Sequence, residues 1–481
     1  MQEMRALGQG RSAAAPAHVV GDHSPVVAIV GGGFSGISVA IQLLLEPRHA
    51  VSRVVLVEPR AELGAGVAYA TRDYPYPLNV AAGQMSLDGT RPDDFLEFVR
   101  SQGIQASAGD YLPRQVYGEY LRARFDAAAA RGHAEHRRAR VLQLRRAAEG
   151  GWSLWLDDGS MLGARAVVLA PGNPPPATPA ECLEISSTGR YIHDPWNIGA
   201  HTQGSIDSVL LLGSGLTMID AALRLAAIRP RVRRIHVLSR HGLLPLPQSA
   251  GAAPVPAPDL EAIHRAQGST RKLLAALRGA ARAQSACGGD WRAVLGAVRP
   301  QLPQIWRTLD SAERGLFLRH ARAYWDVHRH RAPPGPLAAV RALEQLGVLE
   351  IHAGRLVSVR PIDEVLEVQW RPRGAIRPRA CLVDHVVNCT GPDLRVAHNQ
   401  DPLIRSLLSA GFIRPDAHGL GIEVAADGAV IGHDGLAVSG LYYLGPWLRA
   451  RDWEATAVPE LRAHAAHLAR TLASQLQAVP A

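Results

Sequence analysis

The stretch Val26-Val27-Ala28-Ile29-Val30-Gly31-Gly32-Gly33-Phe34-Ser35-Gly36 decides the fold of this chain. An apolar run typical of a buried strand breaks into Gly-x-Gly-x-x-Gly, and residues 37–45 continue it with helical character. Gly31 allows a tight turn, Gly33 lets the backbone approach a pyrophosphate, and Gly36 permits close packing of helix on strand. The free N–H groups at the helix start attract an anion. We therefore predict a dinucleotide-binding turn that includes Phe34 and Ser35.

The segments after this turn supply further parts of the same predicted site. The apolar run 54–57 delivers Glu58 about 20 positions after Gly36, where the ribose of a dinucleotide requires a carboxylate. A glycine loop at 63–69 lets backbone run close to the ligand. Run 164–171 completes a parallel sheet, whose carboxyl edge binds ligands. The additional predicted binding residues are Arg60, Gly66, Val67, Val141 and Gly172.

Residues 77–86 show neither strand alternation nor helical periodicity. In a dinucleotide-binding protein such a segment either wraps around the ring system of the ligand or forms an ordinary surface loop. On the first interpretation, Gln84 and Met85 lie beside the ring system and are candidate catalytic residues.

A second strand, glycine turn and helix begins at residue 208. Gly213, Gly215, Leu216 and Thr217 form its turn, but Met218 stands where the third glycine of the motif belongs. The next strand-like run, 234–238, ends in Ser239 and Arg240 and brings no acid. A hydroxyl and a guanidinium suit a ribose 2′-phosphate, so we predict NADPH rather than NADH. The alternative is that Arg240 is an ordinary surface arginine.

Composition excludes several classes of protein. The chain has 481 residues, of which 47% are hydrophobic, and a net charge of +9. Lys272 is the only lysine, and the arginines are scattered without an aromatic-basic motif, so no nucleic-acid partner is predicted. No apolar run approaches the roughly 20 residues of a membrane span, and residues 1–23 lack the apolar centre of a signal peptide. We expect a cytoplasmic protein with a flexible N-terminal lead and no membrane association.

Cysteine and histidine spacing predicts no metal site. The four cysteines contain no Cys-x-x-Cys pair, which argues against dithiol chemistry and against zinc. His328 and His330 are two positions apart on a predicted helix and point to different faces. We expect His328 to share one packed face with Phe317, Ala321 and Tyr324.

The expected architecture is an α/β fold with two Rossmann-like domains and a helical insertion. A flexible lead covers residues 1–23. The first domain is discontinuous, 24–205 and 380–481, because the run 383–391 repeats the strand-to-glycine design of 166–172. The second domain is 206–255 and 335–379, and the predicted helical cap is 256–334. Further binding residues predicted at the ends of strands or at the start of the last helix, 453–472, are Gly391, Gly445 and Trp453.

With both turns placed, the chain resembles the two-dinucleotide-binding flavoproteins. More narrowly, it resembles a bacterial FAD/NAD(P)-binding protein family, mostly uncharacterised and related to class B flavin monooxygenases. The phrases that carry this resemblance span residues 31–36, 63–69, 194–196, 213–217, 325–331, 388–392 and 453–462. The resemblance implies FAD at the first turn and NADPH at the second.

Relatives in the wider group often carry Phe-x-Gly-x-x-x-His-x-x-x-Trp between the two nucleotide sites. Here Gly189 and His193 keep that spacing, whereas Ser187 replaces the phenylalanine and Trp196 arrives one residue early. The resemblance makes His193 and Trp196 candidate catalytic residues near the nicotinamide. The acid that often follows the last glycine of the FAD domain is missing, because Pro446 follows Gly445.

The resemblance implies an FAD-dependent, NADPH-consuming oxidoreductase, most simply a flavin monooxygenase. Such an enzyme inserts one oxygen of O2 into a small-molecule substrate through a C4a-peroxyflavin, by N-hydroxylation, S-oxidation or Baeyer-Villiger chemistry. One alternative is a reductase or dehydrogenase that passes electrons to an organic or protein acceptor. A second is a non-enzymatic redox-sensing flavoprotein. The substrate and the oligomeric state are not predicted.

Overall fold

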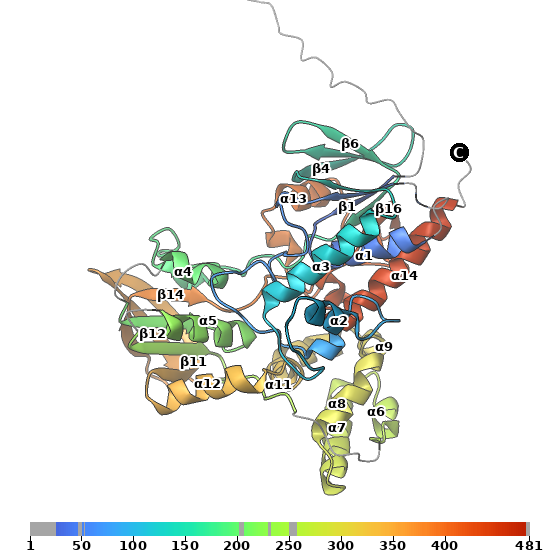
Figure 1. Ribbon diagram of the computed structural model, residues 1–481. Coiled ribbons are helices and arrows are strands. Elements are labelled where there is room, and N and C mark those ends of the chain that lie inside the picture. The colour runs from blue at the N-terminus through green and yellow to red at the C-terminus, as the bar shows by residue number, and fades with distance from the viewer. Residues whose placement is uncertain are drawn as a thin grey trace, which may run out of the picture.

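A computed structural model describes residues 26–46, 51, 53–201, 206–228, 232–249 and 257–477. The predicted N-terminal lead lies outside these residues. The model confirms the predicted fold class, because each glycine turn belongs to its own sheet with a parallel centre and a helical insertion extends from the pair (Figure 1). Within the described ranges, no helix is long and apolar enough to cross a membrane.

The first sheet holds the first glycine turn. Strand β1 lies between β2 and β7 and pairs with both in parallel, and β3 and β16 extend the parallel order on either side. In order, the strands are β15 (Ala429–Ile431), β16 (Ala437–Tyr443), β7 (Ala166–Leu169), β1 (Val26–Val30), β2 (Arg53–Val57) and β3 (Ala134–Arg137). Only β15 is antiparallel to its neighbour.

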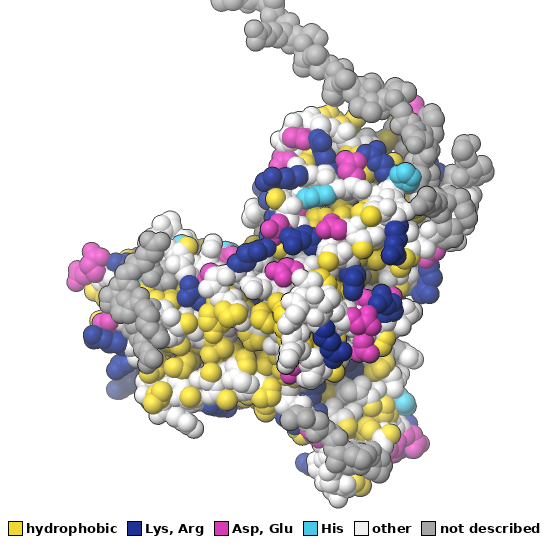
Figure 2. All heavy atoms as spheres, in the orientation of Figure 1, with side chains coloured by type: hydrophobic (Ala, Val, Ile, Leu, Met, Phe, Trp, Pro, Cys, Tyr) yellow, Lys and Arg dark blue, Asp and Glu magenta, His cyan; other side chains and the backbone are white. Residues whose placement is uncertain are grey.

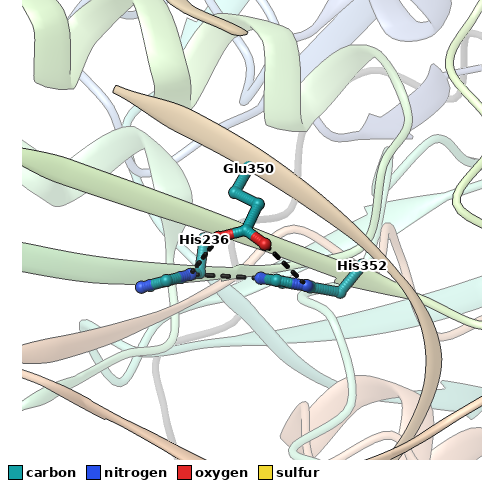
Figure 3. A group of neighbouring side chains, drawn as sticks. All are labelled: His236, Glu350 and His352. Atoms are coloured by element: carbon teal, nitrogen blue, oxygen red, sulfur yellow. Dashed lines mark hydrogen bonds and ion pairs between the residues drawn. The ribbon is translucent and has the colours of Figure 1, made fainter. Parts of the chain in front are cut away.

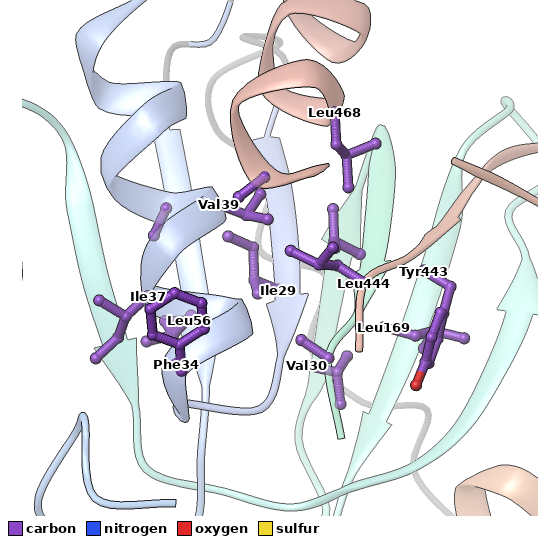
Figure 4. Packing of buried hydrophobic residues seen from close by; sticks show 14 of the residues in the cluster. Ile29, Val30, Phe34, Ile37, Val39, Leu56, Leu169, Tyr443, Leu444 and Leu468 are labelled. Carbon is purple, nitrogen blue, oxygen red and sulfur yellow. The ribbon is translucent and has the colours of Figure 1, made fainter. Parts of the chain in front are cut away.

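Helices cover this sheet and share its core. Helix α1 (Phe34–Leu45) contacts α3 (Arg114–Ala129) and α14 (Val458–Gln477). Figure 4 shows Val39, Leu444 and Leu468 converging from α1, the end of β16 and α14. Helix α2 (Asp94–Ser101) packs on α3, and α13 (Pro402–Ser409) packs on a three-stranded sheet of β4 (Val141–Arg146), β5 (Trp152–Leu156) and β6 (Met161–Ala164).

The second sheet holds the second glycine turn and is covered on one face by α5 (Leu216–Ala227) and α12 (Pro334–Gln345). In order, its strands are β13 (Arg379–Val383), β12 (Val365–Pro372), β11 (Leu349–Ile362), β10 (Arg234–Ser239), β9 (Ser208–Leu212), β14 (His385–Asn388) and β8 (Tyr191–Ile192). Strand β12 pairs antiparallel with both of its neighbours, β11 and β13, and the remaining pairs are parallel. Figure 2 shows hydrophobic side chains gathered over α5 and α12.

Strand β14 differs from its prediction. The run at 383–391 was expected to return the chain to the first domain, but β14 pairs in parallel with β9 and β8 in the second sheet. Residues 191–192, 380–383 and 385–388, which the sequence assigns to the first domain, thus lie in the second sheet. An apolar run that ends in glycine has the same local pattern in either sheet. Only the pairing with distant strands decides between them.

The helical insertion comprises α6 (Glu261–Arg265), α7 (Thr270–Ala286), α8 (Trp291–Val298), α9 (Leu302–Thr308), α10 (Ser311–Leu316) and α11 (Arg322–Arg329). A π-helical turn at Phe317–Ala321 joins α10 to α11 and shifts the helix phase. Trp325 is therefore buried, whereas Tyr324 is 44% exposed, which corrects the predicted face. The last helix also differs, because α14 begins at Val458 rather than at Trp453.

Candidate dinucleotide sites

The first glycine turn has no room for side chains at two of its positions. Gly31 has a φ of +110°, and a Cβ there would lie 2.2 Å from the carbonyl oxygen of Ala170 on the neighbouring strand end. A Cβ on Gly36 would lie 1.9 Å from the carbonyl oxygen of Gly31. The turn therefore brings β1, β7 and α1 together at a separation that only glycine allows.

The space in front of this turn is bordered by glycine backbone without side chains. Gly33 caps the 12-residue helix α1, and a Cβ added to Gly66 would meet only the Cα of Gly33, at 3.4 Å, among the described atoms. The Gly64 N–H donates to the Gly32 carbonyl at 2.9 Å and holds the glycine loop there. Val67, in the same loop, is exposed. A helix N-terminus faced by a second glycine backbone fits a pyrophosphate.

Glu58 stands at the end of β2 and is only 6% exposed. Its Oε2 accepts from the Gly32 N–H at 2.9 Å, and its Oε1 accepts from the Arg60 N–H at 3.1 Å. The Arg60 guanidinium lies 3.9 Å from Oε1. These contacts fix the carboxylate beside the turn, where it can also accept from ribose hydroxyls. The donor and acceptor set at this turn thus fits a dinucleotide.

Other residues predicted for the first site lie in different surroundings. Phe34 and Ser35 are buried in the first turn of α1, and the Phe34 ring stacks 6.4 Å from that of Tyr117. Gly172 has a φ of +77° with no described atom within 4 Å of its Cβ position, so the edge beside β7 is open. Val141 is buried in the first core. At Gly445 a Cβ would lie 2.7 Å from the Tyr443 hydroxyl, which accepts from the Trp447 N–H.

The second turn has the same plan with looser packing. A Cβ on Gly213 would lie 2.5 Å from the Cys389 carbonyl oxygen at the end of β14, whereas Gly215, the cap of the 12-residue helix α5, has no described atom within 4 Å. Leu216 and Thr217 begin that helix. Met218, in place of the third glycine, is fully buried against the second sheet. Gly391 follows β14 and therefore lies at the edge of the second sheet.

The end of β10 is polar and positively charged. The Ser239 hydroxyl accepts from the Ser214 hydroxyl at 2.8 Å and from the Gly242 N–H at 3.0 Å. Arg240 is exposed and makes no hydrogen bond or ion pair with the described part of the chain. Burial lowers the pKa of His241, and the charges of Arg373 and Arg240 lower it further. This edge therefore offers hydroxyl and guanidinium donors that fit a phosphate.

The candidate catalytic residues of the first domain are divided between surface and core. Gln84 lies exposed in a short 3-10 turn, η1 (Ala82–Gln84), whereas Met85 is 2% exposed and packs in the first core. The segment is anchored at Ser86, because the Arg462 guanidinium of α14 donates to the Ser86 carbonyl at 2.6 Å. The structure thus ties residues 84–86 to the start of α14.

Trp196, one of the two candidates of the linker, lies where residues of the first and second domains meet. The Trp196 ring packs edge-on against Tyr76 at 5.4 Å, and the Arg114 guanidinium lies 5.1 Å from its centre. Arg114, in α3, pairs with the buried Asp220 of α5 at 2.7 Å. Burial raises the pKa of Asp220, and Arg114 opposes that rise. His193 lies apart from this pair, with its Nδ1 3.3 Å from the Thr178 hydroxyl.

Sequence reasoning missed a polar junction of all three parts of the chain. Gln248 donates from its side chain to the Asn79 carbonyl at 3.1 Å and from its backbone to the Ala332 carbonyl at 2.9 Å. Burial raises the pKa of Tyr111, and the charge of Arg331, which follows α11, opposes this rise. No local pattern marks these residues, because each lies in a different irregular segment.

Two of the quoted family phrases, 325–331 and 453–462, contact each other. The Trp325 indole donates to Glu454 Oε1 at 2.7 Å, and Arg329 lies 3.0 Å from Glu454 Oε2. The Trp453 ring packs 4.8 Å from Trp306 beside an apolar cavity of about 50 Å³ inside the insertion. Glu454 and Trp453 are almost fully buried. The helical insertion is thus anchored by a paired charge to the segment that leads into α14.

Comparisons with known proteins agree with this architecture. Residues 28–174 match a family model described as FAD-NAD(P)-binding. An uncharacterized protein of Mycobacterium tuberculosis is 25% identical over 407 residues, which cover 77% of this chain and 74% of that protein.

Two solved structures share the fold over 94% of this chain. The ornithine hydroxylase of Pseudomonas aeruginosa in its reduced form is 16% identical, is covered in full and has a TM-score of 0.63. The FAD-bound cadaverine monooxygenase of the desferrioxamine pathway of Erwinia amylovora is 14% identical, is covered over 95% and has a TM-score of 0.67. The resemblance found in the sequence is thereby confirmed, and at these identities the structural likeness establishes the fold.

Proposed function

From the match of residues 28–174 to the FAD-NAD(P)-binding family, we propose that this protein is an FAD-dependent, NADPH-consuming flavin monooxygenase that oxygenates a small molecule. The observation that carries the proposal is the presence of two glycine turns in one chain, each at the carboxyl edge of a parallel sheet and each opening a 12-residue helix. Two such edges bind two dinucleotides.

In this proposal the first turn holds FAD. The N–H groups at the start of α1 and the backbone of Gly66 would bind the pyrophosphate, and Glu58 would accept from the ribose hydroxyls. Arg462 would hold the segment with Gln84 and Met85 beside the ring system through the Ser86 carbonyl. Bound FAD would supply the redox chemistry, by taking a hydride from NADPH and delivering the electrons to O2.

The second turn would hold NADPH. The start of α5 would bind its pyrophosphate, and the exposed Arg240, with Ser239, would bind the 2′-phosphate. The first predicted domain would thus bind FAD, and the second would bind NADPH. The predicted cap would cover the reaction. Strands β8, β13 and β14 belong to the second sheet.

We place the substrate at the polar junction of Tyr111, Gln248 and Arg331. These residues offer a phenol, an amide and a guanidinium, and such groups can orient a small polar substrate. The helical insertion would keep bulk water out, because its tryptophans and Glu454 anchor it to the segment before α14.

Comparison with the structural neighbours favours oxygenation over electron transfer to a dithiol. The titles of the two neighbours above name a hydroxylase and a monooxygenase. Thioredoxin reductase of T. acidophilum shares the fold at a TM-score of 0.50. Here, however, the four cysteines are free and contain no Cys-x-x-Cys pair.

The test is NADPH oxidation by the FAD-loaded protein under ¹⁸O2 with a panel of primary amines, sulfides and ketones. We expect one substrate class to stimulate NADPH oxidation and to yield product with one ¹⁸O atom, detected by mass spectrometry. NADPH oxidation that requires an electron acceptor and gives no labelled product would contradict this and establish a reductase. Bound FAD without NADPH oxidation would leave the redox-sensing alternative.

A further inference from the structure

Three side chains with metal-binding atoms lie together on the second sheet, in a region that the dinucleotide proposal does not use. His236 comes from β10, and Glu350 and His352 come from the adjacent parallel strand β11 (Figure 3). His236 stands opposite Glu350 in the strand register, and Glu350 and His352 share one face because side chains alternate along a strand. One potential ligand atom from each lies within 4.8 Å of the other two.

The distances suit a tetrahedral ion. His236 Nδ1 lies 3.1 Å from His352 Nε2, and two nitrogen ligands bonded to one zinc ion at about 2.0 Å lie roughly 3.3 Å apart. Glu350 reaches both imidazoles, with its oxygens 3.9 Å from His236 Nδ1 and 3.7 Å from His352 Nδ1. A small movement of the Glu350 side chain, which is 62% exposed, would bring one oxygen into bonding distance.

The surroundings hold the imidazoles but leave the carboxylate open. His236 is buried, and the His352 ring packs 4.7 Å from the ring of Trp370 on β12. The exposed Glu350 leaves an entry path from solvent. Arg234 and Arg379 carry positive charge towards the histidines, and this repulsion lowers the affinity for a cation. We therefore expect weaker zinc binding than at a site of the same ligands without neighbouring cations.

We propose that His236, His352 and Glu350 bind one Zn²⁺, with a water molecule as fourth ligand. In the metal-free protein, one of the two facing nitrogens, His236 Nδ1 or His352 Nε2, carries the proton of their hydrogen bond. When zinc binds, this proton would move to the other nitrogen of the same ring. Both facing nitrogens could then bind the metal, and no proton would be released overall. This proposal departs from the expectation of no metal site that the cysteine and histidine spacing gave.

The proposed zinc site is separate from both dinucleotide sites. His236 and Glu350 lie three residues before the Ser239–Ala353 pair, and His352 lies opposite Leu238, one residue before Ser239, so the separation depends on the face of the sheet. The His236 side chain lies on the face opposite the core under α5 and α12, because Ile235 and Val237 fill that core. Zinc would therefore cross-link β10 and β11 and stabilise the second sheet, while turnover would not require it.

The experiment is isothermal titration of the purified, FAD-loaded protein with ZnCl2, followed by thermal unfolding with and without zinc and by the visible spectrum of the Co²⁺ form. We expect one ion per chain, a higher unfolding temperature with zinc, and the intense bands of tetrahedral cobalt. His352→Gln should abolish binding. Glu350→Gln, at an exposed position that leaves the core intact, should weaken it at least tenfold.

His398→Gln is the matched control, because His398 is also paired with a carboxylate, Asp393 at 3.5 Å, but lies outside this cluster. It should bind zinc as the unmodified protein does. The proposal is overturned if the folded protein binds no zinc. It is also overturned if His352→Gln and Glu350→Gln bind zinc with unchanged affinity, since the ion would then sit elsewhere.

Discussion

The two glycine turns of this protein share a backbone plan and differ in what surrounds it. In the first, Gly36 allows α1 to approach the Gly31 carbonyl, and Glu58 returns a carboxylate to the Gly32 N–H. In the second, Met218 replaces the third glycine and fills a core, and a hydroxyl and an exposed guanidinium replace the acid. Under the proposed function, the turn would bind the pyrophosphate in both sites, whereas the residue at the end of the next strand would distinguish a ribose hydroxyl from a 2′-phosphate.

The largest effect is expected from Gly36→Ala. The added Cβ would overlap the backbone oxygen of Gly31, which cannot move as a flexible side chain can, so α1 must shift away from the turn. Overpacking of this kind costs about 1–3 kcal/mol or more. We expect purified protein without FAD and with a lower unfolding temperature, measured by flavin absorbance and calorimetry. Gly163→Ala, with no described atom near its Cβ, should behave as the unmodified protein. Full FAD content in Gly36→Ala would contradict the assignment.

Glu58→Ala should have the next largest effect. It leaves the Gly32 and Arg60 N–H groups without their acceptor and removes the proposed ribose partner. Unsatisfied buried donors cost about 1–3 kcal/mol, so we expect the Kd for FAD to rise roughly 10- to 100-fold in fluorescence titrations of the apoprotein. Glu58→Gln should fall between, and the exposed Glu149→Ala should leave the Kd unchanged. An unaltered Kd for FAD in Glu58→Ala would contradict the proposal that a carboxylate binds the ribose at the first turn.

Arg240→Ala tests the second strand end. Loss of a charge-assisted contact of about 1.5–3 kcal/mol should raise the KM for NADPH roughly 10- to 100-fold and leave the KM for NADH unchanged. Arg360→Ala, an exposed arginine at the far end of β11, is the control for net charge. Equal changes for both nucleotides would show that Arg240 does not contact the 2′-phosphate.

The smallest effect is expected from Ser239→Ala. The hydroxyl accepts from the Ser214 hydroxyl and from the Gly242 N–H, so its loss frees one backbone donor at the rim of the second site. A neutral hydrogen bond contributes about 0.5–1.5 kcal/mol, which predicts a rise of roughly 2- to 10-fold in the KM for NADPH. Ser186→Ala, at an exposed serine away from this edge, should change nothing. A larger rise in the KM for NADPH than in Arg240→Ala would show that Ser239 contributes more to NADPH binding than Arg240 does.

The local parts of both turns could be predicted because their signals are local. A strand of apolar residues, a glycine at positive φ and a following helix each depend on neighbouring residues, and the structure has all three at both turns. The contacts between distant segments could not be predicted from the sequence. Nothing near Trp325 or Arg329 indicates that Glu454 is their partner, and nothing near His236 indicates Glu350 and His352.

The sequence by itself determined the fold class, two glycine turns with their helices, and the absence of an acid after the second strand. These features depend on periodicity and on the steric freedom of glycine, which neighbouring residues set. The tertiary structure alone decided that β14 joins the second sheet, that the π-helical turn buries Trp325, and that His236, Glu350 and His352 meet. Strand pairing and side-chain packing between remote segments are properties of the whole chain, because each segment's local pattern is compatible with several partners.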